Sequence, residues 1–496
     1  MPTVSDILYD MNLRFYVLRS ASSKKLLLLA LPLIMANLSQ PLLGLVDTAV
    51  LGHLGDAQLL AGAAVGTFLL SQIIWLLGFL RMSISGLAAQ QFGALSLFSS
   101  STTTPTPKAR AWFDELARGL TCALLLGAGL YLLSGPLLTW IKAFTELPAL
   151  AQSSLHTYFS IRVANAPIIL FNLVLIGWMV GHQRTKHVMW IQILGNLTNI
   201  ALNLILVFGF DLSVAGLAYA TVTTEWLMCI ASIAMIFRYV QSREQAVSAK
   251  LSESVPAAPL SQQINASQIT LLSPNWFRLS RFYRLLSLNR DLFIRSVFLQ
   301  LCLAFVTYQG ARYGVEAAAI NALLMQFFVI IALGLDGIAN AIEALIGEAQ
   351  GQADERQKWQ NIGVSFMWSS LFALSFAIIF ALGFSDILGV LTNQIQIIAA
   401  AQPYYGLIVA LPLLAHWCYC LDGIYIGLTR ADIMRNSMFV SALFGFFFVY
   451  WLTLDLQNVG LWYALLALQT MRGLTLGGHL LWLYNKRLNR LAKIPR

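Results

Sequence analysis

The chain has 496 residues, of which 58% are hydrophobic and only 11% are charged, whereas about a quarter of an ordinary soluble protein is charged. This composition excludes a soluble globular protein and predicts an integral membrane protein. Apolar runs of helical length recur without the alternation of a membrane β-barrel, so we predict an all-α fold. The net charge of +9 is gathered in connecting segments, which argues against binding of nucleic acid.

The first apolar run, KKLLLLALPLIMANLSQPLLGLVDTAVLGHLGD at residues 24–56, is long enough to cross a bilayer. Pro32 and Pro41 each remove a helical hydrogen bond, so we predict a helix that bends at these residues. An ionised carboxylate at the depth of Asp47 is costly, so Asp47 should take up a proton or hold a cation such as Na⁺. Gln40 lies about two turns earlier on the same face. The alternative is a helix-end aspartate satisfied by water.

The apolar runs predict twelve membrane crossings in all. We place them at about 26–51, 58–92, 111–141, 152–182, 185–208, 214–240, 289–314, 316–350, 355–385, 396–427, 432–455 and 457–485. Lysine and arginine are concentrated in alternate connections and in the carboxy-terminal tail. By the positive-inside rule we expect both termini to be cytoplasmic, with the basic excess facing anionic lipid.

Two connections differ in composition from the rest. Residues 95–110 are rich in Ser, Thr and Pro and predict a flexible loop. Residues 241–288 are polar and mixed, and predict a cytoplasmic linker. This linker contains a basic patch, Arg278, Arg281 and Arg284, which we expect to lie along the membrane surface, with partner binding as the less favoured alternative.

The two halves of the chain echo each other. The motif G-x3-G-x2-R begins at Gly177 and again at Gly423, an offset of 246 (423 − 177 = 246). Because six helices separate the copies, the halves enter the membrane in the same direction. We therefore predict two six-helix lobes, at 1–240 and 289–496.

A polar stripe marks the predicted fifth helix. Asn196, Asn199 and Asn203 lie at i, i+3 and i+7, on one face of an otherwise apolar segment. Amide carbonyls can coordinate Na⁺, and amide NH₂ groups can orient a carboxylate. Ordinary hydrogen bonding between helices is the alternative.

The second half carries acids of its own. Asp336 and Asp422 share the tetrapeptide LDGI, and Glu343 follows Asp336 by seven residues on the same face. For Asp336 a substrate contact and an internal ion pair both remain open, whereas Asp422, near a helix end, is predicted to be structural, by pairing with Arg430 or capping an amide. We expect the internal basic partners to be Arg81, Arg162, Arg295 and Arg472.

The first-helix segment LALPLIMANLSQPLLGLVDTAVLGHLG resembles the multidrug and toxic compound extrusion (MATE) family, in particular its DinF-like branch. The resemblance implies a pocket in the amino-terminal lobe formed by Asp47, Gln40, Asn172, Asn199, residue 203 and Thr221. The branch commonly has Asp at position 203, where this chain has Asn203. The departure puts a two-carboxylate proton relay in doubt and leaves Asp47 as the single acid expected in the outer half of this lobe.

The resemblance implies a cation-coupled efflux antiporter, driven by H⁺ or Na⁺, in the bacterial inner membrane. Its expected partners are organic cations, amphipathic compounds and membrane lipid, and we expect it to function as a monomer without a cofactor. A flippase for lipids or lipid-linked oligosaccharides is the runner-up. A membrane-embedded enzyme is less favoured, because the six histidines are scattered and no nucleotide-binding, zinc or flavin motif is present.

Overall fold

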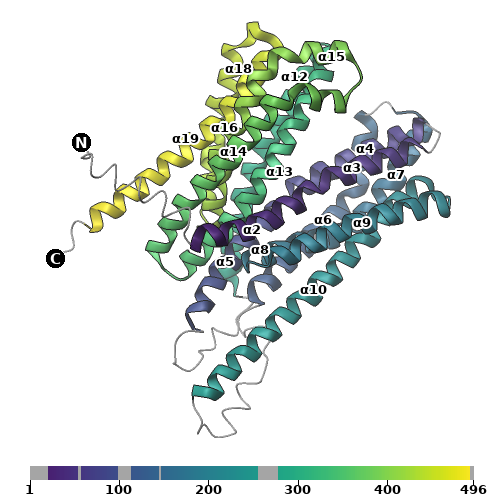
Figure 1. Ribbon diagram of the computed structural model, residues 1–496. Helices are drawn as coiled ribbons and strands as arrows, with labels where there is room; N and C mark the ends of the chain where they lie inside the picture. Colours follow the sequence, from purple (N-terminus) through teal and green to yellow (C-terminus); the bar gives the residue numbers. More distant parts are fainter. Residues whose placement is uncertain (1–20, 54–56, 99–112, 145–146, 255–277, 492–496) are drawn as a thin grey trace. The chain divides into compact units, whose positions relative to one another are not determined.

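The computed structural model describes most of the chain as helix (Figure 1). The described residues are 21–53, 57–98, 113–144, 147–254 and 278–491. Within them, ten helices are long and apolar enough to cross a bilayer, and one bent pair of helices makes an eleventh span. The regular structure of these residues is entirely helical, as the composition predicted.

The first six predicted crossings each correspond to helical segments. These are α2 (Ala21–Leu38), α3 (Gln40–Gly52), α4 (Ala57–Leu76), α5 (Phe79–Phe98), α6 (Asp114–Phe144), α7 (Ala149–Ala164), α8 (Ala166–Gly181), α9 (Thr185–Leu204), the π-helical turn η2 (Ile205–Gly209) and α10 (Ser213–Ser254).

The second set of six is also present. It consists of α12 (Leu279–Arg312), α13 (Val315–Gly351), α14 (Glu355–Leu391), α15 (Ile395–Ala401), η3 (Gln402–Tyr404), α16 (Tyr405–Gly427), α17 (Ala431–Val440), the π-helical η4 (Ser441–Phe447), α18 (Phe448–Leu452), η5 (Leu454–Leu456) and α19 (Gln457–Leu491). The last of these, α19, occupies the place of the twelfth predicted crossing.

The predicted linker at 241–288 is partly helical, and the predicted loop at 95–110 is only partly described. Both α10 and α12 extend into the segment predicted as a linker, because turns beyond the bilayer can remain helical without an apolar period. The rest of that linker, and the Ser/Thr/Pro-rich loop beyond Phe98, lie outside the described residues. Within the basic patch, Arg281 lies 3.6 Å from Asp114, and Arg284 donates to Gln90 at 3.3 Å.

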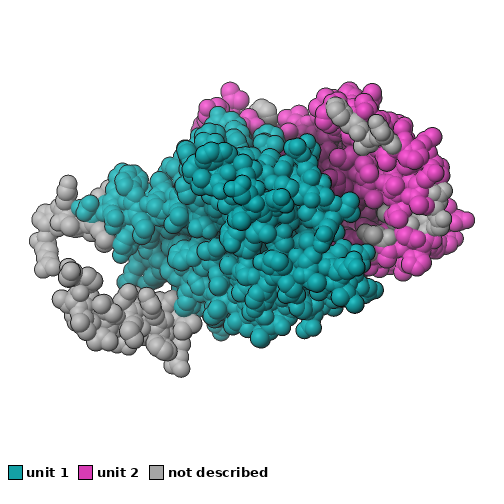
Figure 2. Space-filling view, turned by 90° about the horizontal axis from the view of Figure 1, so that it is seen from above, with its two compact units in different colours: residues 1–34, 290–346, 355–496 teal, residues 35–289, 347–354 magenta. Residues whose placement is uncertain are grey.

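The chain forms two compact units that interleave along the sequence. Figure 2 shows unit 1, which comprises residues 1–34, 290–346 and 355–496, and unit 2, which comprises residues 35–289 and 347–354. The predicted lobes at 1–240 and 289–496 stay a prediction.

Several spans are interrupted at polar residues or prolines. The first is broken at Ser39, whose N–H is shared between the carbonyls of Met35 and Ala36 at 3.2 and 3.3 Å. Pro41 is the second residue of α3, a position that tolerates the missing N–H. The fourth span is bent by 51° between α7 and α8, where Asn165 ends one helix and begins the next.

The turn between α8 and α9 has a copy between α16 and α17. Gln183 and Thr429, which are 246 residues apart, have left-handed backbones with φ of 59° and 55°. The following arginines close both turns in the same way, since Arg184 N–H bonds Met179 O at 2.8 Å and Arg430 N–H bonds Tyr425 O at 2.9 Å. The sequence repeat is therefore also a repeat of backbone geometry.

A buried charge cluster joins three helices of unit 1. Asp422 of α16 accepts hydrogen bonds from Arg295 of α12 and, at 2.5 Å, from Arg472 of α19. All three residues are at most 6% exposed. Both arginines were predicted as internal partners.

The predicted pairing of Asp422 with Arg430 is wrong. Arg430 instead pairs with Asp432, two residues further on, at 2.9 and 3.0 Å in an exposed position. The physical reason is that Arg430 lies in the turn beyond α16, whereas Asp422 faces the helices packed inside the unit.

We expect Asp422→Asn to destabilise the protein, because breaking a buried ion pair costs about 3–5 kcal/mol. Thermal melting of the purified protein in detergent measures the effect. The matched control is Asp432→Asn, whose exposed pair should contribute little. Equal melting temperatures for the two variants would contradict the assignment of Asp422 as the electrostatic centre of unit 1.

Candidate functional site

The asparagine stripe of α9 faces the first helix within unit 2. Asn203 Nδ2 donates to Asp47 Oδ1 at 2.7 Å and to Asn199 Oδ1 at 2.9 Å. Asn199 and Asn203 are at most 1% exposed, and Asp47 is partly buried. The structure therefore brings together three of the residues that the sequence grouped as a site.

The amide orientation of Asn203 suits an ionised Asp47, because its NH₂ group points to the carboxylate and a carboxylate only accepts. The carbonyl Oδ1 of Asn203 is buried without a hydrogen-bond partner. A buried acceptor without a donor is costly, so a cation or a proton donor near it would be stabilised. Oxygens of one carboxylate and two amides are a ligand set that suits Na⁺ or a proton.

A third asparagine of α9 contacts the first span at its break near Ser39. Asn196 Nδ2 donates to Ser39 Oγ at 2.8 Å, and this hydroxyl donates in turn to Ala36 O at 2.7 Å. An apolar cluster that includes Val50 and Val207, about one turn beyond Asp47 and Asn203, packs against α4, α7 and α10. Helix α9 therefore fixes the first span at its break and at its acid.

The contacts described for the other predicted members are different. Gln40 is exposed at the start of α3. Thr221 donates to Leu217 O of its own helix at 3.1 Å. Asn172 donates from Nδ2 to the backbone carbonyl of Glu225 at 2.8 Å.

A second acid, Glu225 of α10, was missed by the sequence reasoning. Its Oε1 lies 2.8 Å from Arg162 Nη1, and its Oε2 accepts from Asn165 Nδ2 at 2.6 Å. Arg162 and Asn165 are each 6% exposed. The signal in the sequence was a lone acid in the apolar run TVTTEWLMC. The expectation that Asp47 is the single acid in the outer half of this lobe stays a prediction.

Glu225 contacts residues at the bend between α7 and α8, the two helices of the fourth membrane span. Arg162 is in the last turn of α7, and Asn165 stands at the junction with α8. We call Arg162, Asn165 and Glu225 the bend clamp. The guanidinium of Arg162 also attracts Asp47 electrostatically. The clamp therefore places a positive charge within electrostatic range of Asp47.

The acids predicted as candidates in the second half belong to unit 1. Asp422 belongs to the ion cluster of unit 1. Glu343 is fully buried in α13, and Asp336 of the same helix lies within electrostatic range of Tyr419. The roles predicted for Asp336 and Glu343 stay predictions.

Comparison with known proteins identifies the family. A family model described as MatE matches residues 32–104 and 292–451. The chain is 37% identical over 458 residues to DNA damage-inducible protein F of Escherichia coli (strain K12), covering 92% of both chains. The chain belongs to the MATE family. It is therefore a secondary transporter and not an enzyme.

More distant relatives agree with this placement. A probable multidrug resistance protein NorM of Chromobacterium violaceum is 22% identical over 98% of this chain and 99% of the relative. The fold is similar to a solved structure of a multidrug resistance MATE family transporter in the outward-facing conformation, with a TM-score of 0.75, 16% identity and coverage of 96% of this chain and 98% of the other. The twelve-helix architecture of MATE transporters fits the helices described here.

We expect Glu225→Gln to lower the transport rate severalfold, because it removes the anion that holds Arg162 at the bend. The rate per molecule is measured with purified protein in liposomes. The matched control is Glu355→Gln, which replaces an exposed partner of Lys358.

The double variant Arg162→Gln/Glu225→Gln separates stability from transport. Removing both charges leaves no unpaired ion, so the melting temperature should recover relative to Glu225→Gln. Transport should remain low if the charges position the bend. Wild-type transport by the double variant would show that the clamp has no part in it.

Proposed function

We propose that this MATE transporter is a cation-coupled antiporter that exports organic cations and amphipathic compounds from the bacterial cytoplasm, with Asp47 as the group that carries H⁺ or Na⁺. The observation that supports this most is the Asp47 contact with neutral Asn203 inside an apolar span. A buried carboxylate whose partner is a neutral amide is stabilised by binding a proton or a cation. A carboxylate that is already paired with an arginine is not stabilised in this way. The protein sits in the inner membrane with both termini cytoplasmic and works as a monomer.

The proposed exchange of ion and substrate uses the contacts of the first span. An ionised Asp47 accepts the hydrogen bond of Asn203, and ion binding competes with this contact. Loss of the contact frees α3 from α9 at one end, while Asn196 retains Ser39 at the break. Ion binding in the outward-facing state therefore moves α3 and releases substrate, and Pro32 and Pro41 supply the bend.

The flippase alternative has less support. Binding of an anionic lipid head group would need cationic side chains open to a cavity. The buried arginines Arg162, Arg295 and Arg472 are each occupied by an acid of their own unit.

The first test is Asp47→Asn, which removes the charge and keeps the shape. Gradient-driven efflux should be abolished, while insertion and thermal stability remain close to wild type. Asp211→Asn, at an exposed acid following the same helix α9, is the matched control and should transport normally. Efflux at the wild-type rate by well-folded Asp47→Asn would refute the proposal.

The coupling ion can be identified with the purified protein reconstituted in liposomes. A pH gradient and a Na⁺ gradient are imposed separately, and drug efflux is followed in each. Coupling predicts efflux against the drug gradient with at least one of them. Efflux at a rate that depends on neither the pH gradient nor the Na⁺ gradient would contradict an antiport mechanism.

We expect Asn203→Asp to change the ion dependence of transport. Two carboxylates in hydrogen-bond contact cannot both ionise freely, so the pair should hold a proton to higher pH or share a cation. Transport should remain proton-coupled to higher pH than in wild type, or depend more strongly on Na⁺. Asn196→Asp, on the same stripe but bonded to Ser39, is the control. Superimposable pH and Na⁺ profiles for Asn203→Asp and wild type would show that residue 203 does not act on Asp47.

A further inference from the structure

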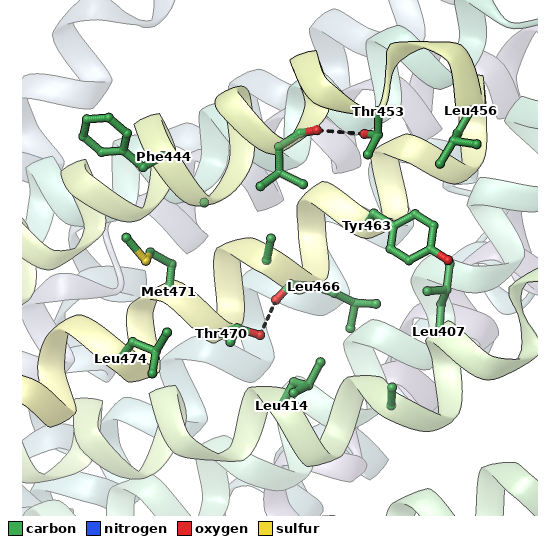
Figure 3. A pocket seen from close by; sticks show the side chains of 14 residues that line it. Leu407, Leu414, Phe444, Thr453, Leu456, Tyr463, Leu466, Thr470, Met471 and Leu474 are labelled. Carbon is green, nitrogen blue, oxygen red and sulfur yellow. Dashed lines mark hydrogen bonds between the residues drawn. The ribbon is translucent and has the colours of Figure 1, made fainter.

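Unit 1 contains a pocket that the proposed ion site does not use. It has a volume of about 760 Å³ and lies between α16, the η4–α18 segment and α19 (Figure 3). Leu407 and Leu414 of α16 line one wall, Phe444 and Val449 a second, and Met471 and Leu474 of α19 the third. This volume is in the range of ligand sites in proteins, about 300–1,000 Å³.

The lining presents almost only carbon. Its threonines are already bonded to backbone, since Thr453 Oγ1 donates to Val449 O at 2.8 Å and Thr470 Oγ1 donates to Leu466 O at 2.9 Å (Figure 3). No charged residue is among the side chains that line it. An organic cation would find no counter-ion in this pocket, and water would find few partners, so hydrocarbon is the occupant that the lining favours.

The size of the pocket matches one leaflet of a bilayer. Its lining on α19 runs from Tyr463 to Leu474, a distance of eleven residue steps, or about 16 Å at 1.5 Å per step. Half of the hydrocarbon core of a bilayer is about 15 Å. One end of the pocket, at Thr453 and Leu456, lies at the turn between α18 and α19, where a span ends.

The pocket is open at its rim. Phe444, Leu456 and Leu474 are 51%, 50% and 64% exposed. In a membrane, acyl chains are the hydrocarbon that surrounds such side chains. An acyl chain can therefore enter the pocket from the surrounding bilayer, between the helices.

Small residues shape the walls of the pocket. Gly445 of η4 lies so close to α19 that an added Cβ would stand 2.9 Å from Met471 Cβ and 3.0 Å from Ala467 O. Where the helices approach, the lining is formed by Gly445 and Ala467, and Ala410 faces the pocket from α16. Gly445 therefore allows η4 to approach α19 closely, whereas the small side chains of Ala410 and Ala467 fill little of the pocket.

The geometry points to a binding site for one acyl chain of a membrane phospholipid, with its head group at the Thr453–Leu456 end. The site lies in a different unit from Asp47 and does not depend on the proposed ion coupling.

Photolabelling of the full-length protein in liposomes tests this assignment. The probe is a phosphatidylethanolamine with a diazirine at the end of one acyl chain, and labelled peptides are identified by mass spectrometry. We expect labelling around Leu414 and Leu474 to exceed severalfold that around Leu382 of α14, an apolar side chain that is 82% exposed. Equal labelling at these places would overturn the proposal, because ordinary surface lipid would explain it.

Pocket-filling variants provide the second arm. Ala467→Phe and, from the opposite wall, Ala410→Phe should each abolish the excess labelling, whereas Ala399→Phe, at an exposed site on α15, should not. Thermal melting identifies any variant that fails to fold, and the two walls give independent tests. Unchanged labelling in both folded filling variants would reject the site. Displacement of the label by a transported organic cation, but not by unlabelled phospholipid, would assign the pocket to substrate and also reject it.

Discussion

A charge inside the bilayer needs a partner, and the two units meet this requirement in different ways. In unit 1, Asp422 is held by Arg295 and Arg472, so its charge is compensated by two guanidinium groups. In unit 2, Glu225 is held by Arg162, but Asp47 receives its hydrogen bond from the neutral Asn203. An acid whose direct contact is neutral keeps its need for a counter-charge. This difference makes Asp47, and not the more deeply buried acids, the group suited to exchange an ion.

The interruptions of the helices depend on the same polar groups. A broken helix leaves backbone groups that lipid cannot satisfy, so breaks in membrane spans require polar partners within the protein. At the first break the Ser39 hydroxyl donates to the backbone carbonyl of Ala36 and accepts from Asn196, and at the second Asn165 donates to Glu225 of α10. The bends of the first and fourth spans are therefore placed by side chains of α9 and α10. Because the Asp47 cluster uses the same α9, the proposed ion site and the break in the first span depend on side chains of one helix.

Much of this arrangement could be predicted from the residues, and the part that could not has a physical reason. Apolar length placed the twelve predicted crossings on helical segments, and within the described residues ten helices and one bent pair are long and apolar enough to span a bilayer. The 3.6-residue period placed Asn199 and Asn203 on one face. Partner choice was harder, because contacts between distant helices leave no local pattern: Asp422 meets Arg295, 127 residues away, and not Arg430. Glu225 was overlooked for the same reason, since its partners lie on α7 and at the bend. Only packing brings Arg162 and Asn165 to its two oxygens.

The repeated backbone carries different chemistry in its two copies. Helices α9 and α17 begin 246 residues apart, after turns with the same hydrogen bonds. The same offset takes Asn199 to Gly445 and Asn203 to Val449, both of which line the apolar pocket of unit 1. Amides that contact a carboxylate in one copy are thus replaced by a glycine and a valine in the other. Since amides can hold an ion and carbon cannot, the same repeated backbone carries the polar cluster of the proposed ion site in unit 2 and the apolar lining of the proposed acyl-chain site in unit 1.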